Sequence, residues 1–238
     1  MSTFVAELIG TALLVLLGDG VVAAVLLGKS KAQGSGWMVI TTGWALGVAL
    51  PVYAVGGISG AHINPAVTIG LALGGKFAWS GVAPYVAAQM LGAFLGAVLV
   101  WLTYLVHWSV TDDPVIKLAV FCTAPAIRRP LANALTELIG TFVLVFGVLA
   151  LGANQPASAS GLTPLLVGVL VWAIGLSLGG PTGYAINPAR DLAPRIAHAL
   201  LPIPGKGGTD WSYAWVPVFG PLAGGALGAV AYVRLFGR

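Results

Sequence analysis

The sequence has one cysteine and few charged residues: Cys122 stands alone, and only 8% of the 238 residues are Asp, Glu, Lys or Arg. A single cysteine excludes an intrachain disulfide and a metal site built from cysteines. The three histidines, His62, His107 and His198, are scattered along the chain, and no Ser/His or paired-Asp arrangement accompanies them. The sequence therefore predicts a protein that is not an enzyme and that binds no metal and no cofactor.

Long stretches contain no charged residue at all: residues 32–75, 77–111, 138–189 and 211–233. Each exceeds the roughly 20 residues that cross a bilayer as a helix. Because 58% of the residues are hydrophobic and soluble domains carry about a quarter charged residues, we predict a protein of the lipid bilayer. A net charge of +4 gives no reason to expect a nucleic-acid partner. No basic segment precedes the first apolar run, which is therefore expected to stay as a helix.

Glycines, prolines and polar clusters divide these stretches into candidate helices. Six are long enough to span a membrane, near residues 4–27, 37–56, 82–106, 131–152, 163–179 and 214–236. Two apolar segments, 64–73 and 187–200, are too short to cross about 30 Å at 1.5 Å per residue. The predicted fold is an all-α membrane protein with six transmembrane helices and two half-helices.

The chain also repeats itself. "AELIGTALLV" at 6–15 matches "TELIGTFVLV" at 136–145, and "SGAHINPAVTIG" at 59–70 matches "TGYAINPARDLA" at 182–193. We interpret residues 1–238 as one transmembrane channel domain, with repeat one at 1–106, a loop at 107–130 and repeat two at 131–238. An odd number of spans per repeat inverts the second copy, and such 3+3 repeats place a solute site near the midplane.

The repeated Asn-Pro-Ala predicts two helices that begin inside the membrane. Asn is a favoured N-cap and proline a favoured first helical residue. The N-terminus of a helix carries unpaired N–H groups and about half a positive charge, so two such ends disfavour cations and protons. The glycine-rich segments 56–62 and 179–185 are expected to be extended and to line a wet cavity. The central residues are Asn64, Pro65, Ala66, Asn187, Pro188 and Ala189, and the carbonyls expected to line the pore are those of Gly60, Ala61, His62, Gly183, Tyr184 and Ala185.

With these motifs the sequence resembles the major intrinsic proteins, the aquaporin and glycerol-facilitator family, over nearly its whole length. The signature "SGAHINPAVT" is highly specific. Members that pass glycerol tend to have Asp after Asn-Pro-Ala-Arg, as in Asn187-Pro188-Ala189-Arg190-Asp191, and Pro with an aliphatic residue in the last helix, as in Pro217-Val218. The resemblance is therefore to the aquaglyceroporin branch.

The resemblance implies a selectivity constriction formed by Trp44, Gly175, Tyr184 and Arg190. It implies a passive channel for glycerol, water and other small uncharged solutes, a homotetramer with one pore per subunit, and cytoplasmic termini. Some members pass undissociated lactic acid, and the sequence does not rank lactic acid against glycerol, dihydroxyacetone or urea. Tyr184 stands where many bacterial facilitators have Phe, and Ala124-Pro125 where they often place an aromatic before Pro, so both positions bear on selectivity.

Three acidic residues lie within predicted spans. Glu7 and Glu137 match between the repeats, and the resemblance implies that they brace the carbonyl-bearing segments by accepting N–H groups. Asp19 has no acidic counterpart, since Leu149 takes its place, and a hydrogen bond within the bundle is the default expectation. The alternative function is an ion- or proton-coupled secondary transporter, in which one of these acids would carry the coupling ion.

Cytoplasmic termini conflict with the distribution of basic residues. They would place Lys76, Arg234 and Arg238 inside, and Lys29, Lys31, Lys117, Arg128, Arg129, Arg190, Arg195 and Lys206 outside. This distribution is opposite to the positive-inside rule. Two of the outer eight belong to the second half-helix and others to longer loops, so the orientation implied by the repeats is preferred.

Overall fold

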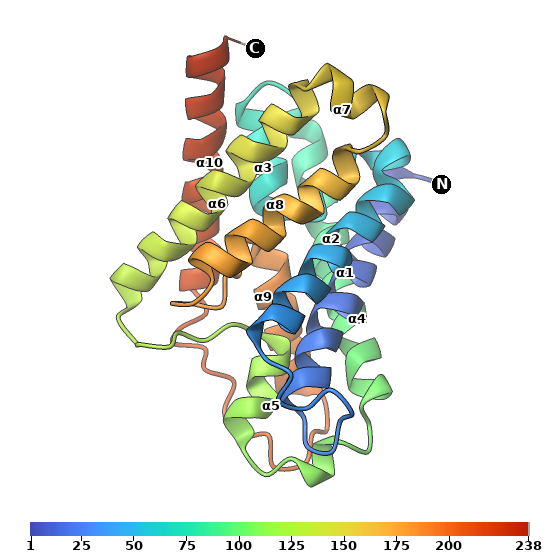
Figure 1. Ribbon diagram of the computed structural model, residues 1–238, viewed down its shortest axis with the longest axis vertical. Coiled ribbons are helices and arrows are strands. Elements are labelled where there is room, and N and C mark those ends of the chain that lie inside the picture. The colour runs from blue at the N-terminus through green and yellow to red at the C-terminus, as the bar shows by residue number, and fades with distance from the viewer. Residues whose placement is uncertain (238) are drawn as a thin grey trace.

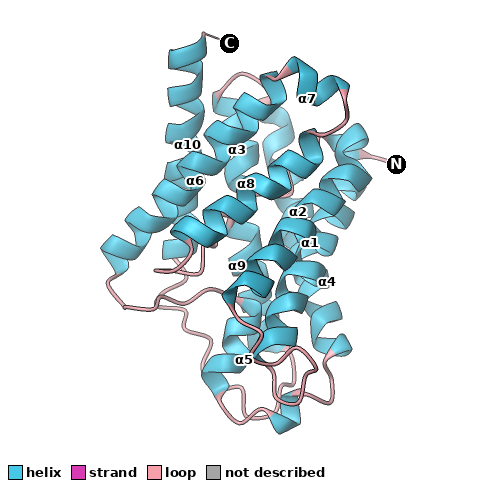
Figure 2. Cartoon of the chain, in the orientation of Figure 1, coloured by secondary structure: helices cyan, strands magenta, loops and turns pink. Residues whose placement is uncertain are grey.

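The computed structural model describes residues 1–237, and within them the chain is helical with no strand (Figures 1 and 2). The six long helices are α1 (Thr3–Leu26), α2 (Trp37–Ser59), α4 (Val82–Thr103), α6 (Pro130–Ala153), α8 (Thr163–Leu178) and α10 (Val216–Phe236). The half-helices are α3 (Pro65–Leu73) and α9 (Pro188–Leu200), and short elements are η1 (Trp79–Gly81), η2 (Trp108–Val110), α5 (Pro114–Phe121) and α7 (Gln155–Ala159). The predicted fold class is confirmed.

Helix ends differ from the prediction in informative places. Residues Gly56 and Gly57, expected to be extended, belong to α2, which continues to Ser59 and ends at Gly60 in the left-handed region. Glycine weakens a helix by about 1 kcal/mol, but inside a bilayer every backbone group needs a partner, and the helix supplies them. At the matching place in the second half, α8 ends at Leu178 and has only 16 residues. The remaining five long helices are long and apolar enough to span a membrane.

Stripes of small residues bring the long helices into close contact. A methyl group on Gly92 or Gly96 of α4 would lie 2.2 Å from the Leu8 oxygen or 2.5 Å from the Ala12 oxygen of α1. Gly224 and Gly228 of α10 approach α6 in the same way, at 2.1 Å from the Leu138 oxygen and 2.6 Å from the Phe142 oxygen. These stripes therefore serve packing between helices of the same chain.

The half-helices enter the bundle from opposite ends. In Figure 1, α3 lies toward the end where both described termini are found, and α9 lies toward the end with α5 and the long loops. Both are shielded by the long helices: α3 packs against α10 and α4, and α9 against α4, α10 and α5. The segments leading into the half-helices therefore meet in the interior of the bundle, where the candidate site lies.

Candidate channel site

Each half-helix begins at an asparagine that caps it. The Asn64 side chain accepts from the Ala66 N–H at 2.8 Å, and that of Asn187 accepts from the N–H groups of Ala189 at 3.0 Å and Arg190 at 3.2 Å. Proline occupies the first turn of both helices, where a missing N–H costs nothing. The local sequence thus fixes where each half-helix starts.

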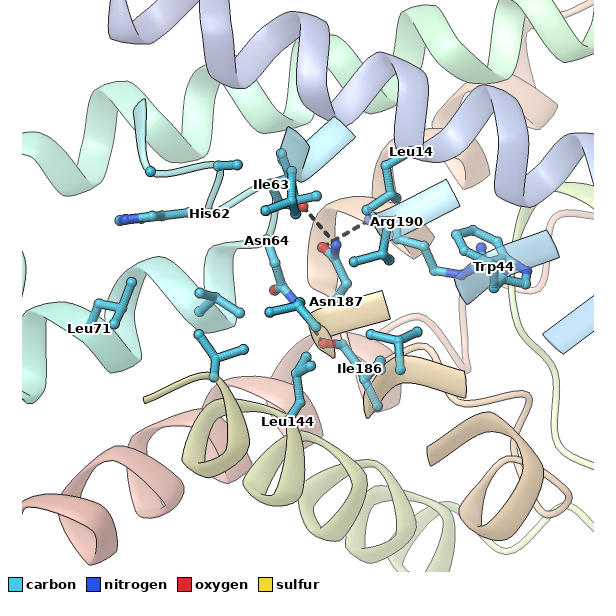
Figure 3. A pocket seen from close by; sticks show the side chains of 18 of the residues that line it. Leu14, Trp44, His62, Ile63, Asn64, Leu71, Leu144, Ile186, Asn187 and Arg190 are labelled. Atoms are coloured by element: carbon cyan, nitrogen blue, oxygen red, sulfur yellow. Dashed lines mark hydrogen bonds between the residues drawn. The ribbon is translucent and has the colours of Figure 1, made fainter. Parts of the chain in front are cut away.

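The two asparagines also tie the halves to each other. Asn64 Nδ2 donates to the Ile186 oxygen at 2.8 Å, and Asn187 Nδ2 donates to the Ile63 oxygen at 2.9 Å. Figure 3 shows the two amides side by side at the centre of the cavity. A side-chain amide has two N–H donors, so each asparagine keeps one for a solute. The two isoleucine carbonyls were missing from the predicted acceptors, because their partners come from the other half of the chain.

The segments before the asparagines follow a strained backbone path. Positive φ occurs at Gly60, Ala61 and Ile63, with values of 83°, 48° and 43°. The corresponding residues Gly183, Tyr184 and Ile186 have 84°, 40° and 42°. For residues other than glycine, and above all for a β-branched one, such a conformation costs on the order of 1–3 kcal/mol and persists only where the surroundings impose it.

Two buried glutamates hold these segments in place. Glu7 accepts from the N–H groups of His62 at 2.9 Å and Ile63 at 2.7 Å, and also from the Ser59 hydroxyl and the Gln89 amide. Glu137 accepts from the N–H groups of Ala185 at 3.0 Å and Ile186 at 2.8 Å. With the N–H groups bound by a carboxylate, the carbonyls of the same segments remain available to accept other hydrogen bonds.

A cavity of about 240 Å³ runs between the two halves. Of the six residues whose carbonyls were predicted to line it, five do so, and Gly183 does not. Both asparagines and Arg190 supply polar side chains to the wall. The rest is mainly aliphatic, with Leu14, Val48, Val52, Val67, Leu71, Leu144, Val148, Val167 and Val171. Such a wall, apolar with a few placed polar groups, suits a small ligand.

Three of the four predicted constriction residues line this cavity: Trp44, Tyr184 and Arg190. The Arg190 guanidinium carbon lies 4.0 Å from the centre of the Trp44 ring, and Figure 3 shows the two side chains next to each other. The Tyr184 hydroxyl has no hydrogen-bond partner within residues 1–237. The donors of Arg190 therefore stand beside an aromatic face, whereas the buried Tyr184 hydroxyl is out of reach of a ligand in the cavity.

Gly175 has a different role from the one predicted. It does not line the cavity, because the Tyr184 ring occupies the space beside it. A methyl group on Gly175 would lie 2.8 Å from Tyr184 Cζ. The ring also packs edge-on against Trp37, whose Nε1 donates to the Gly175 oxygen at 3.1 Å. The space left by the missing side chain of Gly175 is therefore filled by the Tyr184 ring and is not open to a solute.

Further residues behind the constriction were not identified from the sequence. Gly18 leaves room for Trp44, since a methyl group there would lie 2.2 Å from the ring. Asp19, expected to form a hydrogen bond, instead forms an ion pair with Arg190 at 3.2 Å, and that expectation was wrong. A glycine preceding an acid within an apolar helix was the available signal, but it does not identify the partners.

The basic residues near the loop end are mostly bound within the protein. Arg195 pairs with Asp191 at 2.9 Å, and Arg128 pairs with Asp210 at 2.7 Å. The Lys117 ammonium donates to the Pro204 oxygen, and Lys206 donates to three carbonyls at the end of α9. Together with Arg190, five of the eight residues in the conflict over orientation have structural roles. Arg238, counted at the opposite end, lies outside the described residues.

The fold and this site define a membrane channel of the major intrinsic protein class. Residues 1–232 match the major intrinsic protein family, to which the chain belongs, and the predicted resemblance is confirmed. The chain is 67% identical to the probable glycerol uptake facilitator protein of Thermotoga maritima, covering 99% of this chain and 100% of the relative. It is 61% identical to the glycerol uptake facilitator protein of Bacillus subtilis, covering 99% and 85%.

Two further similarities widen the comparison. The D/L-lactic acid transporter of Lactiplantibacillus plantarum is 40% identical, with 98% of this chain and 97% of the relative covered. The X-ray structure of the aquaglyceroporin from Plasmodium falciparum superimposes with a TM-score of 0.84 at 30% identity, covering 98% of this chain and 95% of that one. The chain is thus a multi-pass membrane protein with the aquaglyceroporin fold.

Proposed function

We propose that this protein is a passive channel, a glycerol uptake facilitator, through which glycerol, water and other small uncharged solutes diffuse across the membrane. The observation that carries the proposal is the pair of helix-capping asparagines, Asn64 and Asn187. Each donates one amide N–H to a carbonyl of the other half of the chain and keeps its second N–H for a solute. Relatives named as glycerol uptake facilitators at 67% and 61% identity support this function.

The constriction suits a polyol. Glycerol presents hydroxyls along one edge and carbon-bound hydrogens along the other. The Arg190 guanidinium supplies hydrogen bonds for the first edge, and the Trp44 face supplies apolar contact for the second. Further along the cavity, the backbone carbonyls of lining residues such as His62 are expected to accept hydrogen bonds from the hydroxyls of the solute. A solute therefore exchanges water for protein partners without losing hydrogen bonds.

The same wall opposes ions and protons. No acidic residue lines the described cavity, and two helix N-termini point their partial positive charge at its centre. A cation there would lose its hydration without a compensating negative charge.

The arrangement of acids supports a passive channel over an ion-coupled transporter. Glu7 and Glu137 are buried and accept hydrogen bonds from the segments they hold, so binding and releasing an ion would disturb the pore itself. Asp19 faces Arg190 and is already compensated. None of the three is placed as an exchangeable ion site.

We further propose a homotetramer with one pore per subunit and termini on the cytoplasmic side. Large apolar side chains such as Leu46, Leu50, Leu95 and Leu99 are exposed on the outer faces of the helices, where lipid or other subunits would cover them. Cross-linking and native mass measurement test the tetramer. The structural roles of Lys117, Arg128, Arg190, Arg195 and Lys206 remove much of the conflict with the positive-inside rule.

Stopped-flow light scattering on proteoliposomes tests the channel. The panel is water, glycerol, dihydroxyacetone, urea and lactic acid, each with and without a pH gradient. We expect glycerol permeability well above that of empty liposomes, rising linearly with the gradient. For lactic acid, the relative named as its transporter makes uptake of the undissociated form worth measuring. No glycerol permeability above empty liposomes would contradict the proposal, and proton-coupled accumulation would favour the transporter.

A further inference from the structure

Arg190 of the constriction, in α9, has an acidic partner in α1. Asp19, in the middle of α1, is fully buried, and its Oδ1 lies 3.2 Å from Arg190 Nη1. Neither Asp19 oxygen accepts a hydrogen bond within residues 1–237. A buried carboxylate without hydrogen bonds is costly, so this residue depends on the charge of Arg190.

Both residues of this pair also lie at positions where the halves of the chain differ in charge. Counting from the matching Asn-Pro-Ala segments, Arg190 corresponds to Val67, and counting from the matching first helices, Asp19 corresponds to Leu149. Neither charge has a counterpart in the other half, and yet the two lie in contact. Their contact indicates that they act as a unit.

The pair determines which donors of Arg190 reach the cavity. Nη1 faces Asp19 and donates to the Phe121 oxygen at 3.3 Å, and the guanidinium carbon lies over the Trp44 ring. Within residues 1–237, neither Nη2 nor Nε donates to the protein. Because a guanidinium has five N–H donors in a planar fork, holding Nη1 aims the others into the cavity.

The neighbouring charges leave Asp19 as the counter-ion. Asp191 accepts from Arg195 Nε at 3.0 Å and from the backbone and hydroxyl of Thr123, each at 2.7 Å. The carboxylate of Asp191 is thus occupied by Arg195. Arg190 therefore has Asp19 as its ion-pair partner among the described residues.

We infer that Asp19 is a specificity-determining positioning residue of the channel. It holds the Arg190 guanidinium against Trp44 and cancels its charge, so that the constriction donates hydrogen bonds to uncharged solutes without retaining anions. This inference rests on the proposed function, because it assigns Arg190 to the solute path. Asp19 itself does not line the cavity and acts through Arg190.

A double-mutant cycle in proteoliposomes tests whether Asp19 acts through Arg190. Asp19→Asn keeps the shape and removes the charge, and Arg190→Val installs the residue found at the matching position of the first half. We expect Asp19→Asn to lower glycerol permeability at least about threefold in the wild-type background and to have little effect beside Arg190→Val. An equal loss in both backgrounds, or no loss in the wild type, overturns the inference.

An anion provides a readout that a merely structural residue would not change. Sodium formate at neutral pH should leave glycerol flux through the wild type unchanged and should inhibit flux through Asp19→Asn, whose arginine is uncompensated. Absence of inhibition in the variant contradicts the charge-cancelling role. Asp210→Asn is the matched control, because it neutralises the acidic partner of another arginine, Arg128, which does not line the cavity. It should leave both measurements as in the wild type.

A replacement variant and the wild-type measurement separate a failure to fold from a failure of the inference. If Asp19→Asn does not yield folded protein, Asp19→Leu replaces it, since leucine fills the corresponding buried position at residue 149. The same cycle and the same formate inhibition are expected from it. Wild-type protein that fails to pass glycerol refutes the proposed function, whereas a conducting wild type with an additive cycle refutes only the role of Asp19.

Discussion

The two halves of the molecule share a backbone and differ in what they place along it. Gly60 to Ile63 and Gly183 to Ile186 have positive φ at the same three places, each segment is held by a buried glutamate, and each leads into an asparagine-capped half-helix. The shared part makes a passage with two polar centres. It does not by itself choose a solute, because a symmetrical wall would present the same groups at both ends.

The differences gather at one end of the cavity. Measured from Asn64 and Asn187, the lining residues correspond as Trp44 with Val167, Ala61 with Tyr184, and Val67 with Arg190. In every pair the large or charged member belongs to the constriction. The passage therefore comes from what the two halves have in common, and the selection of a solute from where they differ.

Each bulky residue of the constriction is matched by a small residue behind it. Trp44 rests on Gly18, and Tyr184 on Gly175. In the other half the corresponding pairs are Val148 with Val167, and Val52 with Ala61, so neither combines a bulky ring with a glycine. In the constriction, a larger side chain is thus compensated by a smaller residue in contact with it. The two halves therefore keep a similar packing density.

The largest effect is expected from replacing the two buried glutamates, which accept different numbers of hydrogen bonds. Glu7 accepts from four donors and Glu137 from two backbone N–H groups. Each buried donor left unsatisfied costs about 1–3 kcal/mol. We expect Glu137→Ala to lower the free energy of unfolding by about 2–6 kcal/mol, and Glu7→Ala to lower it by at least about 1 kcal/mol more. Unfolding in detergent micelles, followed by circular dichroism, measures both.

The glutamine variants serve as the milder controls for this comparison. Gln keeps one acceptor oxygen, so Glu7→Gln and Glu137→Gln should lose less stability than the alanine variants, with the ratio of glycerol to water permeability unchanged. Equal losses of stability at the two positions would contradict the expected effect of the different numbers of hydrogen bonds that the two glutamates accept. A changed permeability ratio in a fully stable variant would point to a transport role for these acids.

A smaller effect is expected from breaking the compensation of side-chain volume at Tyr184. In Gly175→Val the added side chain pushes the ring into the cavity, because even a methyl group there would lie 2.8 Å from Tyr184 Cζ. We expect glycerol permeability to fall about tenfold, as overpacking of this kind costs about 1–3 kcal/mol. Adding Tyr184→Ala restores the Val52 and Ala61 arrangement of the other half and should recover glycerol flux. Stopped-flow measurements of both variants decide it, and a double variant as blocked as the single one would show that the ring is not the obstruction.

Much of the fold could be predicted because membranes permit few alternatives. Charge-free stretches fix the long helices, and Asn-Pro fixes the first residue of each half-helix. The end of α2 was misjudged, because Gly56 and Gly57 were interpreted by their local preference. The bilayer's demand for paired backbone groups outweighed the low helix propensity of glycine.

The candidate site was less accessible to sequence reasoning. A glycine such as Gly175 shows that a side chain is missing, but not which neighbour fills the space. The pairing of Asp19 with Arg190 joins α1 to α9, and no spacing within either helix encodes it. Comparing the two repeats shows that Asp19 has no acidic counterpart in the second repeat. Its partner, Arg190, is identified only from the way the two halves pack together.

The smallest predicted effect compares the two ends of the molecule. At the loop end, Arg128 donates to both carboxylate oxygens of Asp210, at 2.7 and 2.8 Å, and thereby lowers the pKa of Asp210. At the other end, the Tyr53 hydroxyl donates to the Gly161 oxygen at 3.0 Å, without a charge. The Arg128 side chain is 48% exposed, so solvent screening limits the pair to roughly 0.2–1 kcal/mol.

Because the folded pKa of Asp210 is depressed, its contribution to stability is present above the unfolded value of about 3.9 and is lost as the pH falls through the lower folded pKa. Asp210→Asn should therefore lower the free energy of unfolding by a few tenths of a kcal/mol at pH 7, and the difference should vanish in acid and shrink in salt. Tyr53→Phe, which removes an uncharged bond, should give a loss that does not depend on pH over the same range. Unfolding of both variants at pH 7 and pH 3 measures the contrast, and an acid-insensitive loss in Asp210→Asn would show that Arg128 contributes by packing and not by charge.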